Sequence, residues 1–251
     1  MGDPSAYGEA FADVYDDWYG DVSDIEGTVS TVARLAGDGP VLELGIGTGR
    51  LALPMAAAGL EVHGVDASPA MVERLRAKPE GAAIPVLVAD FAEQLPAVPG
   101  GFSVVLVAFN TFLNLVADGA QARCLTLVHD ALRPGGALVL EAFVPAEAPV
   151  ASGVDVRTVA SEEVVLSVFR RQGEVVAGSL VTLSAAGGVS LRPWSVLPRT
   201  PQQLDELAGR AGLTVERRHG GWRSEPFDDD ADRHVTVYRR SGGTVTAVNE
   251  S

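Results

Sequence analysis

The residues most able to do chemistry form a glycine-rich segment at positions 41–50. Its sequence, VLELGIGTGR, joins an apolar run to the helix-like run LALPMAAA at 51–58. Gly45, Gly47 and Gly49 lack a Cβ, so the backbone can turn sharply after a strand and approach a bound ligand closely. The segment therefore predicts a ligand-binding turn between a strand and a helix.

The spacing of the glycines bears on which ligand they hold. A dinucleotide fingerprint, G-x-G-x-x-G, would place its third glycine at position 50, where this chain has Arg50. The pattern here is instead E-x-G-x-G-x-G, beginning at Glu43. Asp66 ends the next strand-like run, where an acid can accept hydrogen bonds from the hydroxyls of a ribose. We therefore expect a ligand with a nucleoside part.

The glycine segment is one of six pieces of a pattern that follow one another along the chain. The pieces are 43–49, Asp66, Asp90-Phe91, Phe109-Asn110, the RPGG of 133–136, and the EAF of 141–143. In this order they resemble the class I S-adenosylmethionine (SAM)-dependent methyltransferases, and most closely the small-molecule methyltransferases of bacterial secondary metabolism. The resemblance covers roughly positions 40–145 well and 200–240 loosely.

The resemblance implies a SAM site built from these pieces. It places Glu43 near the methionine ammonium, Asp66 on the ribose, and Asp90 with Phe91 on the adenine. For Asp90 the alternative is a loop cap, and for Arg50 an exposed charge is as well supported as a contact with the methionine carboxylate. The implied cofactor-binding residues are Tyr15, Glu43, Gly45, Gly47, Gly49, Arg50, Asp66, Ala67, Met71, Asp90, Phe91, Phe109 and Asn110.

Aromatic residues are spaced four apart near the start of the chain. Tyr7, Phe11, Tyr15 and Tyr19 would share one face of a helix over residues 5–20. Packing of this face on the core is the plainer interpretation. In many small-molecule methyltransferases a Tyr-Asp-x-x-Tyr segment folds over the cofactor as a lid, and the YDDWY of 15–19 is similar to it.

No residue stands out as a general base. Lone histidines are more often packing or surface residues than catalysts, which is our expectation for His63, His129 and His234. An amine acceptor would need no base, because an amine is nucleophilic once it is neutral. The candidates for contact with the acceptor are Tyr19, Asn110, Glu141 and His219, with Trp194 as a further pocket residue.

Strand-like and helix-like runs alternate from position 41 to 143, which predicts a parallel sheet with crossover helices. We expect an α/β fold: a Rossmann-like, seven-stranded methyltransferase sheet, mostly parallel, with an antiparallel β insertion after the fifth strand. The predicted divisions are a SAM-binding core with N-terminal helices over 1–145, the insertion over 146–199, a last helix and closing hairpin over 200–240, and a disordered tail over 241–251. The insertion is expected to cover the substrate or to form a dimer surface.

Composition limits the partners and the compartment. The net charge of −14 disfavours nucleic acid, and no apolar run is long enough to cross a membrane. The single cysteine, Cys124, falls in a helix-like run, where a buried structural thiol is expected, and the absence of a signal sequence predicts a cytoplasmic protein. The acids of 228–232 lack the spacing of a cation loop, so no metal site is predicted. A homodimer is among the expected states.

The leading hypothesis is a SAM-dependent methyltransferase that acts on an O, N or C atom of a small molecule. A second hypothesis is a protein that binds SAM or its demethylated product without transferring the methyl group, because a fold and a cofactor site do not fix chemistry. A nicotinamide dehydrogenase shares the glycine turn, but Arg50 and the Asp90-Phe91 pair count against it. A non-catalytic module is the remaining alternative.

Overall fold

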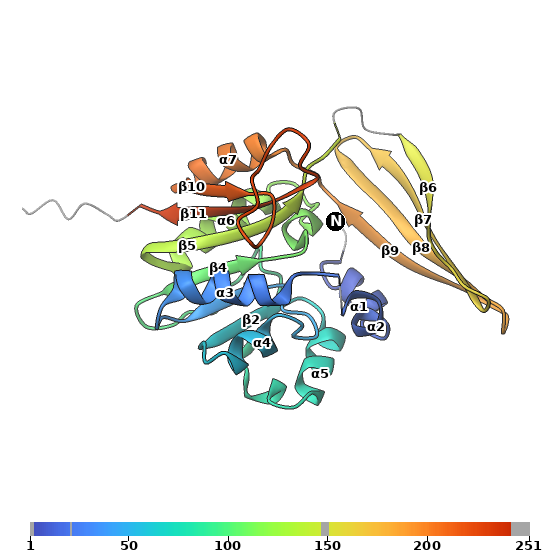
Figure 1. Cartoon of the computed structure of the whole chain (residues 1–251), viewed down its shortest axis with the longest axis horizontal. Coiled ribbons are helices and arrows are strands. Elements are labelled where there is room, and N and C mark those ends of the chain that lie inside the picture. Colours follow the sequence, from blue (N-terminus) through green and yellow to red (C-terminus); the bar gives the residue numbers. More distant parts are fainter. Residues whose placement is uncertain (1–2, 21, 147–150, 242–251) are drawn as a thin grey trace, which may run out of the picture.

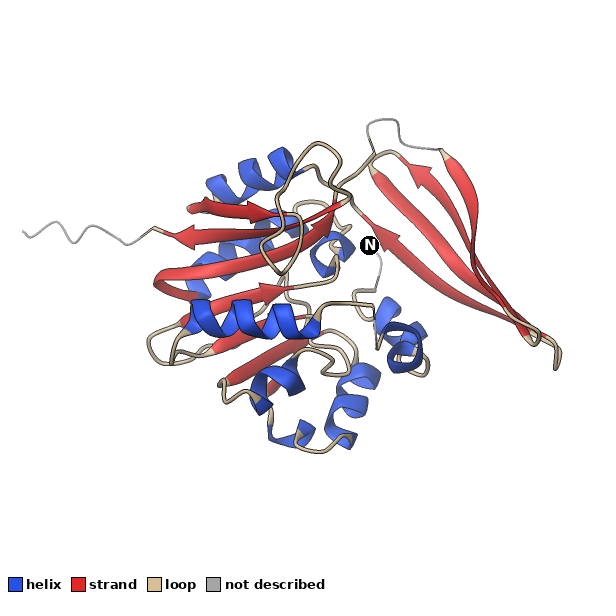
Figure 2. Cartoon of the chain, in the orientation of Figure 1, coloured by secondary structure: helices blue, strands red, loops and turns tan. Residues whose placement is uncertain are grey.

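The core of the protein is a seven-stranded sheet, shown by a computed structural model that describes residues 3–20, 22–146 and 151–241. The order of the strands is β10-β11-β5-β4-β1-β2-β3, and β3, β2, β1, β4 and β5 run parallel (Figures 1 and 2). The strands are Val41–Leu44 (β1), Val62–Asp66 (β2), Val86–Val88 (β3), Phe102–Val107 (β4), Leu132–Phe143 (β5), Leu213–His219 (β10) and Arg233–Arg240 (β11). The predicted fold class is confirmed, including the antiparallel hairpin β10–β11 at one edge.

Helices cover both faces of this sheet because its central strands are apolar on both sides. Val32, Met55 and Leu75 fill one core layer, and Leu125 and Leu204 lie in the other. Cys124 is buried in the second layer, as predicted. The helices are Ile25–Ala36 (α3), Ala52–Ala57 (α4), Pro69–Ala77 (α5), Ala120–Ala131 (α6) and Pro201–Arg210 (α7), with single 3-10 turns at Gly81–Ala83 (η1) and Thr111–Asn114 (η2).

The N-terminal segment differs from the single helix expected over 5–20. It forms two short helices, Ala6–Phe11 (α1) and Tyr15–Tyr19 (α2), joined by a turn. Asp13 in this turn pairs with the guanidinium of Arg192 through two bonds of 2.8 Å. The break lets α1 pack on α5 and on the insertion while α2 turns toward the glycine segment, which one straight helix could not do.

The insertion is a separate four-stranded antiparallel sheet in the order β6-β7-β8-β9. Figure 1 shows that it stands beside the core sheet, with α1 and α2 between them at one end. Its strands, Ser152–Val159 (β6), Glu163–Gln172 (β7), Val175–Ser184 (β8) and Val189–Val196 (β9), match the predicted meander.

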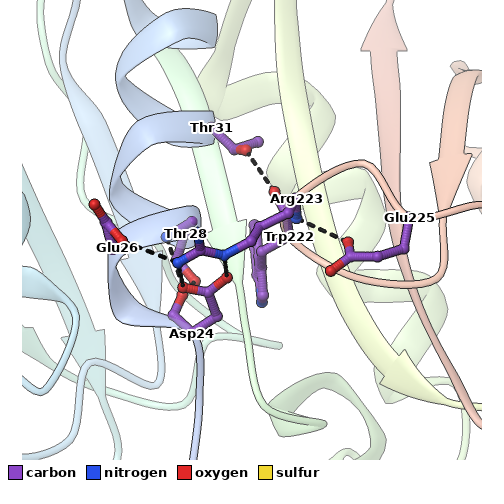
Figure 3. A network of polar contacts seen from close by, with 8 residues as sticks. Asp24, Glu26, Thr28, Thr31, Trp222, Arg223 and Glu225 are labelled. Atoms are coloured by element: carbon purple, nitrogen blue, oxygen red, sulfur yellow. Dashed lines mark hydrogen bonds and ion pairs between the residues drawn. The ribbon is translucent and has the colours of Figure 1, made fainter.

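The long connection between β10 and β11 is fixed to α3 by polar contacts (Figure 3). The Arg223 guanidinium donates to both carboxylate oxygens of Asp24, at 2.6 and 3.1 Å, and to Glu26 at 2.9 Å. The Thr31 hydroxyl donates to the carbonyl of Trp222, whose indole is buried in the core beside α3. The predicted tail over 241–251 lies almost wholly outside the described residues, and none of the described helices is long and apolar enough to cross a membrane.

Candidate active site

Three acidic residues predicted to share a site lie at one edge of the sheet. Glu43 is the second-last residue of β1, Asp66 is the last residue of β2, and Asp90 follows the end of β3. These strands are parallel neighbours, so their carboxyl ends point the same way. Ligands of open α/β sheets bind at this edge.

The glycine turn adopts a backbone that only glycine accommodates without strain. Gly45 and Gly49 have φ of +69° and +82°. A Cβ on Gly45 would lie 2.5 Å from the Thr111 methyl group, and one on Gly49 would collide with Leu75. Both the conformation and the packing beneath the turn therefore require glycine.

Asp66 holds the glycine turn in place. One carboxylate oxygen accepts the Gly47 N–H at 2.8 Å and the other accepts the Ser68 N–H at 2.8 Å. Burial raises the pKa of Asp66, although both backbone N–H groups act in the opposite direction. Each oxygen has a further lone pair, so the carboxylate can still accept hydrogen bonds from a ligand.

Glu43 is a buried carboxyl group without a full set of partners. Its side chain is 5% exposed, and its Oε2 atom has no hydrogen-bond partner. Burial raises the pKa of Glu43 to about 8, against the opposing effect of Arg50, and the neighbouring Asp66 charge raises it further. A cation placed beside this group would supply the missing partner and favour its ionised form.

Glu43 lines a cavity of about 20 Å³ beneath α2, together with Tyr15, Arg50, Phe109 and Thr111. The Arg50 guanidinium lies over the Phe109 ring, 4.8 Å from its centroid. Its Nη1 donates to the Ser23 hydroxyl, while its Nε atom is buried without a partner. Glu43 and Arg50 thus line one cavity, and each has a buried polar atom without a partner. A carboxylate and a guanidinium are the side chains that could hold the ammonium and the carboxylate of the methionine part of SAM.

Helix α2 is bound to the glycine turn by contacts that the sequence did not predict. The Thr48 hydroxyl donates to Asp16 at 2.5 Å, and Lys78 contacts both the other Asp16 oxygen and the Thr48 carbonyl at 2.8 Å. These contacts hold the pKa of Asp16 below its usual value, despite partial burial. They fix Tyr15 and Tyr19 above the cavity, where the Tyr19 ring lies 5.6 Å from that of Phe109. Lys78 carried no sequence signal, because it follows a helix with no recognisable link to the lid.

Asn110 and Glu141 support the end of β4. Phe109 and Asn110 have φ of +51° and +64°, which is strained for residues with a side chain. The Glu141 Oε2 atom accepts the Phe109 N–H at 2.7 Å, and the Asn110 side-chain oxygen accepts the Phe143 N–H at 2.7 Å. These bonds hold the Phe109 ring against Arg50 and Tyr19.

The predicted adenine region is partly occupied by contacts within the chain. One Asp90 oxygen accepts the Ala92 N–H at 2.8 Å, which is the loop cap considered as an alternative, and its other oxygen stays available for a ligand. Phe91 is packed in the core at 8% exposure, and Met71 is buried against Phe11 of α1. Ala67 is half-buried between Asp66 and the helix α5 that Ser68 caps.

The histidines lie apart from the cavity under α2. His219 lines a different cavity of about 10 Å³ with Thr31 and Arg34 of α3. His63 contacts Glu61 near the start of β2, and His129 contacts Asp130 on α6. His234 is buried and bonded to Thr236, and burial lowers its pKa to about 4. Trp194 packs in the aromatic cluster of α1, α2 and the insertion, and the part of the chain that the structure describes holds no cluster of potential metal ligands.

Comparisons with known proteins bear on the family to which this chain belongs. A family model described as a methyltransferase domain matches residues 41–136, which span the glycine turn and the three strand-end acids. Together with the full-length similarity below, this match shows that the chain belongs to the class I SAM-dependent methyltransferases, and its cofactor is SAM.

The similarity extends over the whole chain. The CcbJ methyltransferase from Streptomyces caelestis is 34% identical, with a TM-score of 0.88, and the match covers 96% of this chain and 100% of that one. The cypemycin N-terminal methyltransferase of a Streptomyces species is 28% identical over 259 residues, covering 96% of this chain and 100% of the relative. The amino pentose methyltransferase CalS10 from Micromonospora echinaspora, 22% identical with a TM-score of 0.71 over 91% of this chain and 97% of that one, shares the fold. The hypothesis of a SAM-binding protein without methyl transfer is not favoured by these relatives.

Proposed function

We propose that this methyltransferase transfers the methyl group of SAM to the nitrogen of a small-molecule amine. The observation that carries the proposal is the state of the groups around the cavity. Among the described residues, the ionisable side chains that line the cavity are Tyr15, Glu43 and Arg50, and no histidine lines it. A phenol has an ordinary pKa of about 10 and is neutral near pH 7, and burial raises the pKa of Tyr15 further, so Tyr15 is a poor base. A hydroxyl acceptor would need a base, whereas an amine that reaches the site neutral would not.

The residues of the site then have distinct proposed roles toward the cofactor. The sulfonium of SAM makes its methyl group electrophilic, so the protein contributes mainly placement. Glu43 accepts from the ammonium, Arg50 donates to the carboxylate, Asp66 accepts from the ribose, and Asp90 accepts from the adenine amine. The supporting observations are the unpaired Glu43 Oε2 and Arg50 Nε atoms and the carboxylates at neighbouring strand ends.

We place three residues near the acceptor, with different roles: Tyr19, Asn110 and Glu141. Glu141 and Asn110 act through the backbone of 109–110, which they hold in its left-handed conformation. Tyr19 lies against Phe109 and is the one of the three whose ring borders the aromatic cluster under the insertion. For His219 the placement beside α3 supports a packing role rather than contact with the acceptor.

The proposal includes the type of acceptor, the cellular compartment and the role of the insertion. A relative named as an N-terminal methyltransferase, similar over 96% of this chain, supports a nitrogen acceptor. The net charge of −14 supports a small molecule over nucleic acid, and a single cysteine suits the cytoplasm. Residues 146–199 are proposed as the substrate cover, since the inner face of their sheet packs Val165, Leu180 and Trp194 against α1 and α2.

The test compares matched acceptors that differ only in amine or hydroxyl, using SAM labelled in the methyl group. Label should pass to the amine, and kcat/KM should rise with pH up to the pKa of the free amine. Two amines with different pKa values should shift this midpoint correspondingly, because the acceptor and not a protein base is titrating. Transfer to the hydroxyl compound alone, or a midpoint that ignores the amine, would contradict the proposal.

A further inference from the structure

The outer face of the insertion sheet is apolar and exposed. Cross-strand partners share one face of a sheet, and the partners here form continuous rows: Val154 with Val168, and Val159 with Val164 and Leu183. A central row crosses all four strands through Val156, Leu166, Val181 and Leu191. The exposed members are Val154 at 61%, Val156 at 63%, Val159 at 74%, Val168 at 39%, Leu183 at 41%, Val189 at 65% and Leu191 at 63%. We call this set the outer valine face.

The opposite face of the same sheet is already used. Val165, Ser167 and Leu180 alternate with the outer residues along β7 and β8 and are 4%, 1% and 8% exposed. They lie over α1 and α2 with the aromatic cluster. The sheet therefore has one face toward the active site and one face with nothing packed on it among the described residues.

The size of the outer valine face reaches the lower limit of a specific interface between proteins. Four strands about 4.8 Å apart and about eight residues long at ~3.3 Å per residue cover roughly 500 Å². Two such faces would bury about 1,000 Å², the lower limit of a specific interface. Two antiparallel sheets pack face to face through interdigitating side chains of this kind.

The lack of charged residues in the outer valine face indicates which kind of partner it binds. The rows of the outer valine face hold no acid or base, and Arg170 lies at one end, paired with Ser152 and Ala177. A membrane surface would favour a basic border, and a chain of net charge −14 is repelled by anionic lipid. An uncharged aliphatic surface is complementary to itself, which is what a twofold axis requires. We propose that a second copy of this chain packs on the outer valine face, so that the enzyme is a homodimer joined back to back through its two insertion sheets.

The test measures the mass of the full chain by sedimentation from low to high micromolar concentration. The wild type should sediment at twice the 26.1 kDa of one chain. The double variant Val156→Lys with Leu191→Lys places charges in the central row, and its dimer dissociation constant should rise about 100-fold or more, because buried unpaired charges are costly. The matched controls are Val88→Lys and Val215→Lys, which change valines 42% and 44% exposed on the core sheet and should leave the dimer intact.

Calorimetry of SAM binding and the thermal midpoint show whether each variant is folded. Neither measurement nor the sedimentation uses an acceptor, so the outcome does not depend on the proposal that the acceptor is an amine. A monomeric wild type at high micromolar concentration overturns the proposal, and so does a dimer that tolerates both lysines in the central row. A monomer that floats with neutral or anionic lipid vesicles would assign the face to membrane instead. Loss of the dimer in the control variants as well would place the interface elsewhere.

Discussion

Binding of SAM should release a proton from Glu43. The pKa of about 8 means that roughly 0.9 of this buried carboxyl carries a proton at pH 7 in the free enzyme. An ammonium group beside the unpaired Oε2 atom favours the ionised form and returns the pKa toward its ordinary range. About 0.9 of a proton should therefore leave the protein for each SAM bound at pH 7, and much less at pH 9, where Glu43 is already ionised in the free enzyme.

Calorimetry in buffers of different ionisation enthalpy measures this number directly. The observed enthalpy plotted against the buffer ionisation enthalpy should have a slope near one proton for the wild type and near zero for Glu43→Gln, with Asp17→Asn as the control that keeps both Glu43 and Asp66. A wild-type slope of zero at pH 7 would refute the reasoning, because Glu43 would then be ionised before SAM arrives or would not face its cation.

The same carboxyl sets a pH dependence of stability in the absence of SAM. A folded-state pKa above the unfolded value of about 4.5 means that the folded state binds more protons between the two values, so stability falls as the pH rises from about 4.5 to 8. The loss is on the order of a few kcal/mol. Denaturant unfolding of wild type and Glu43→Gln at several pH values should show a steeper decline for the wild type across this window.

Two other substitutions test the framework of the site. In Asp66→Asn, one of the two backbone N–H groups that donate to the carboxylate would face the N–H₂ group of the amide. The free energy of unfolding should therefore fall by about 1–3 kcal/mol, and the Kd for SAM should rise by about 10-fold or more. An unchanged urea midpoint and an unchanged Kd would contradict the role given to Asp66. Asp16→Asn weakens the latch to Thr48 and Lys78 by about 1–2 kcal/mol, so stopped-flow measurements should show SAM dissociating about five- to 30-fold faster, with Asp17→Asn as the matched control. Equal dissociation rates for the two variants would show that α2 does not gate the cofactor.

The sequence was sufficient to predict the sheet, its insertion and the strand-end acids, because these depend on local periodicity and on the edge at which parallel strands end. It was insufficient to predict the break between α1 and α2, where Asp13 of the turn pairs with Arg192 of β9. It likewise did not predict that Lys78 contacts Asp16 of α2. The Asp13–Arg192 pair and the Lys78–Asp16 pair each join segments that are far apart in the sequence, so only the folded chain shows them. The spacing of four between the aromatic residues was equally consistent with one helix or two.

The roles of Asn110 and Glu141 show a related limit. Their residue types and strand-end positions predicted contact with the acceptor, and this stays a prediction. The sequence did not predict that the side chain of each also accepts a hydrogen bond from a backbone N–H of the neighbouring strand end. The left-handed conformation at 109–110 beside these bonds has no signature in the sequence, because neither residue is glycine.

The place of β11 also affects how the enzyme is made. This strand lies between β5 and β10, so during synthesis β5 has an open hydrogen-bonding edge until residues through Arg240 have left the ribosome. At about 5–20 residues per second, the nascent chain spends about 10–40 seconds with its glycine turn translated but its sheet incomplete. The Arg223 contacts to Asp24 and Glu26 likewise form only after residue 223 has been translated. Until β11 pairs with β5, the open edge of β5 can pair with another chain, so a slow or interrupted ribosome at this stage prolongs the exposure to aggregation.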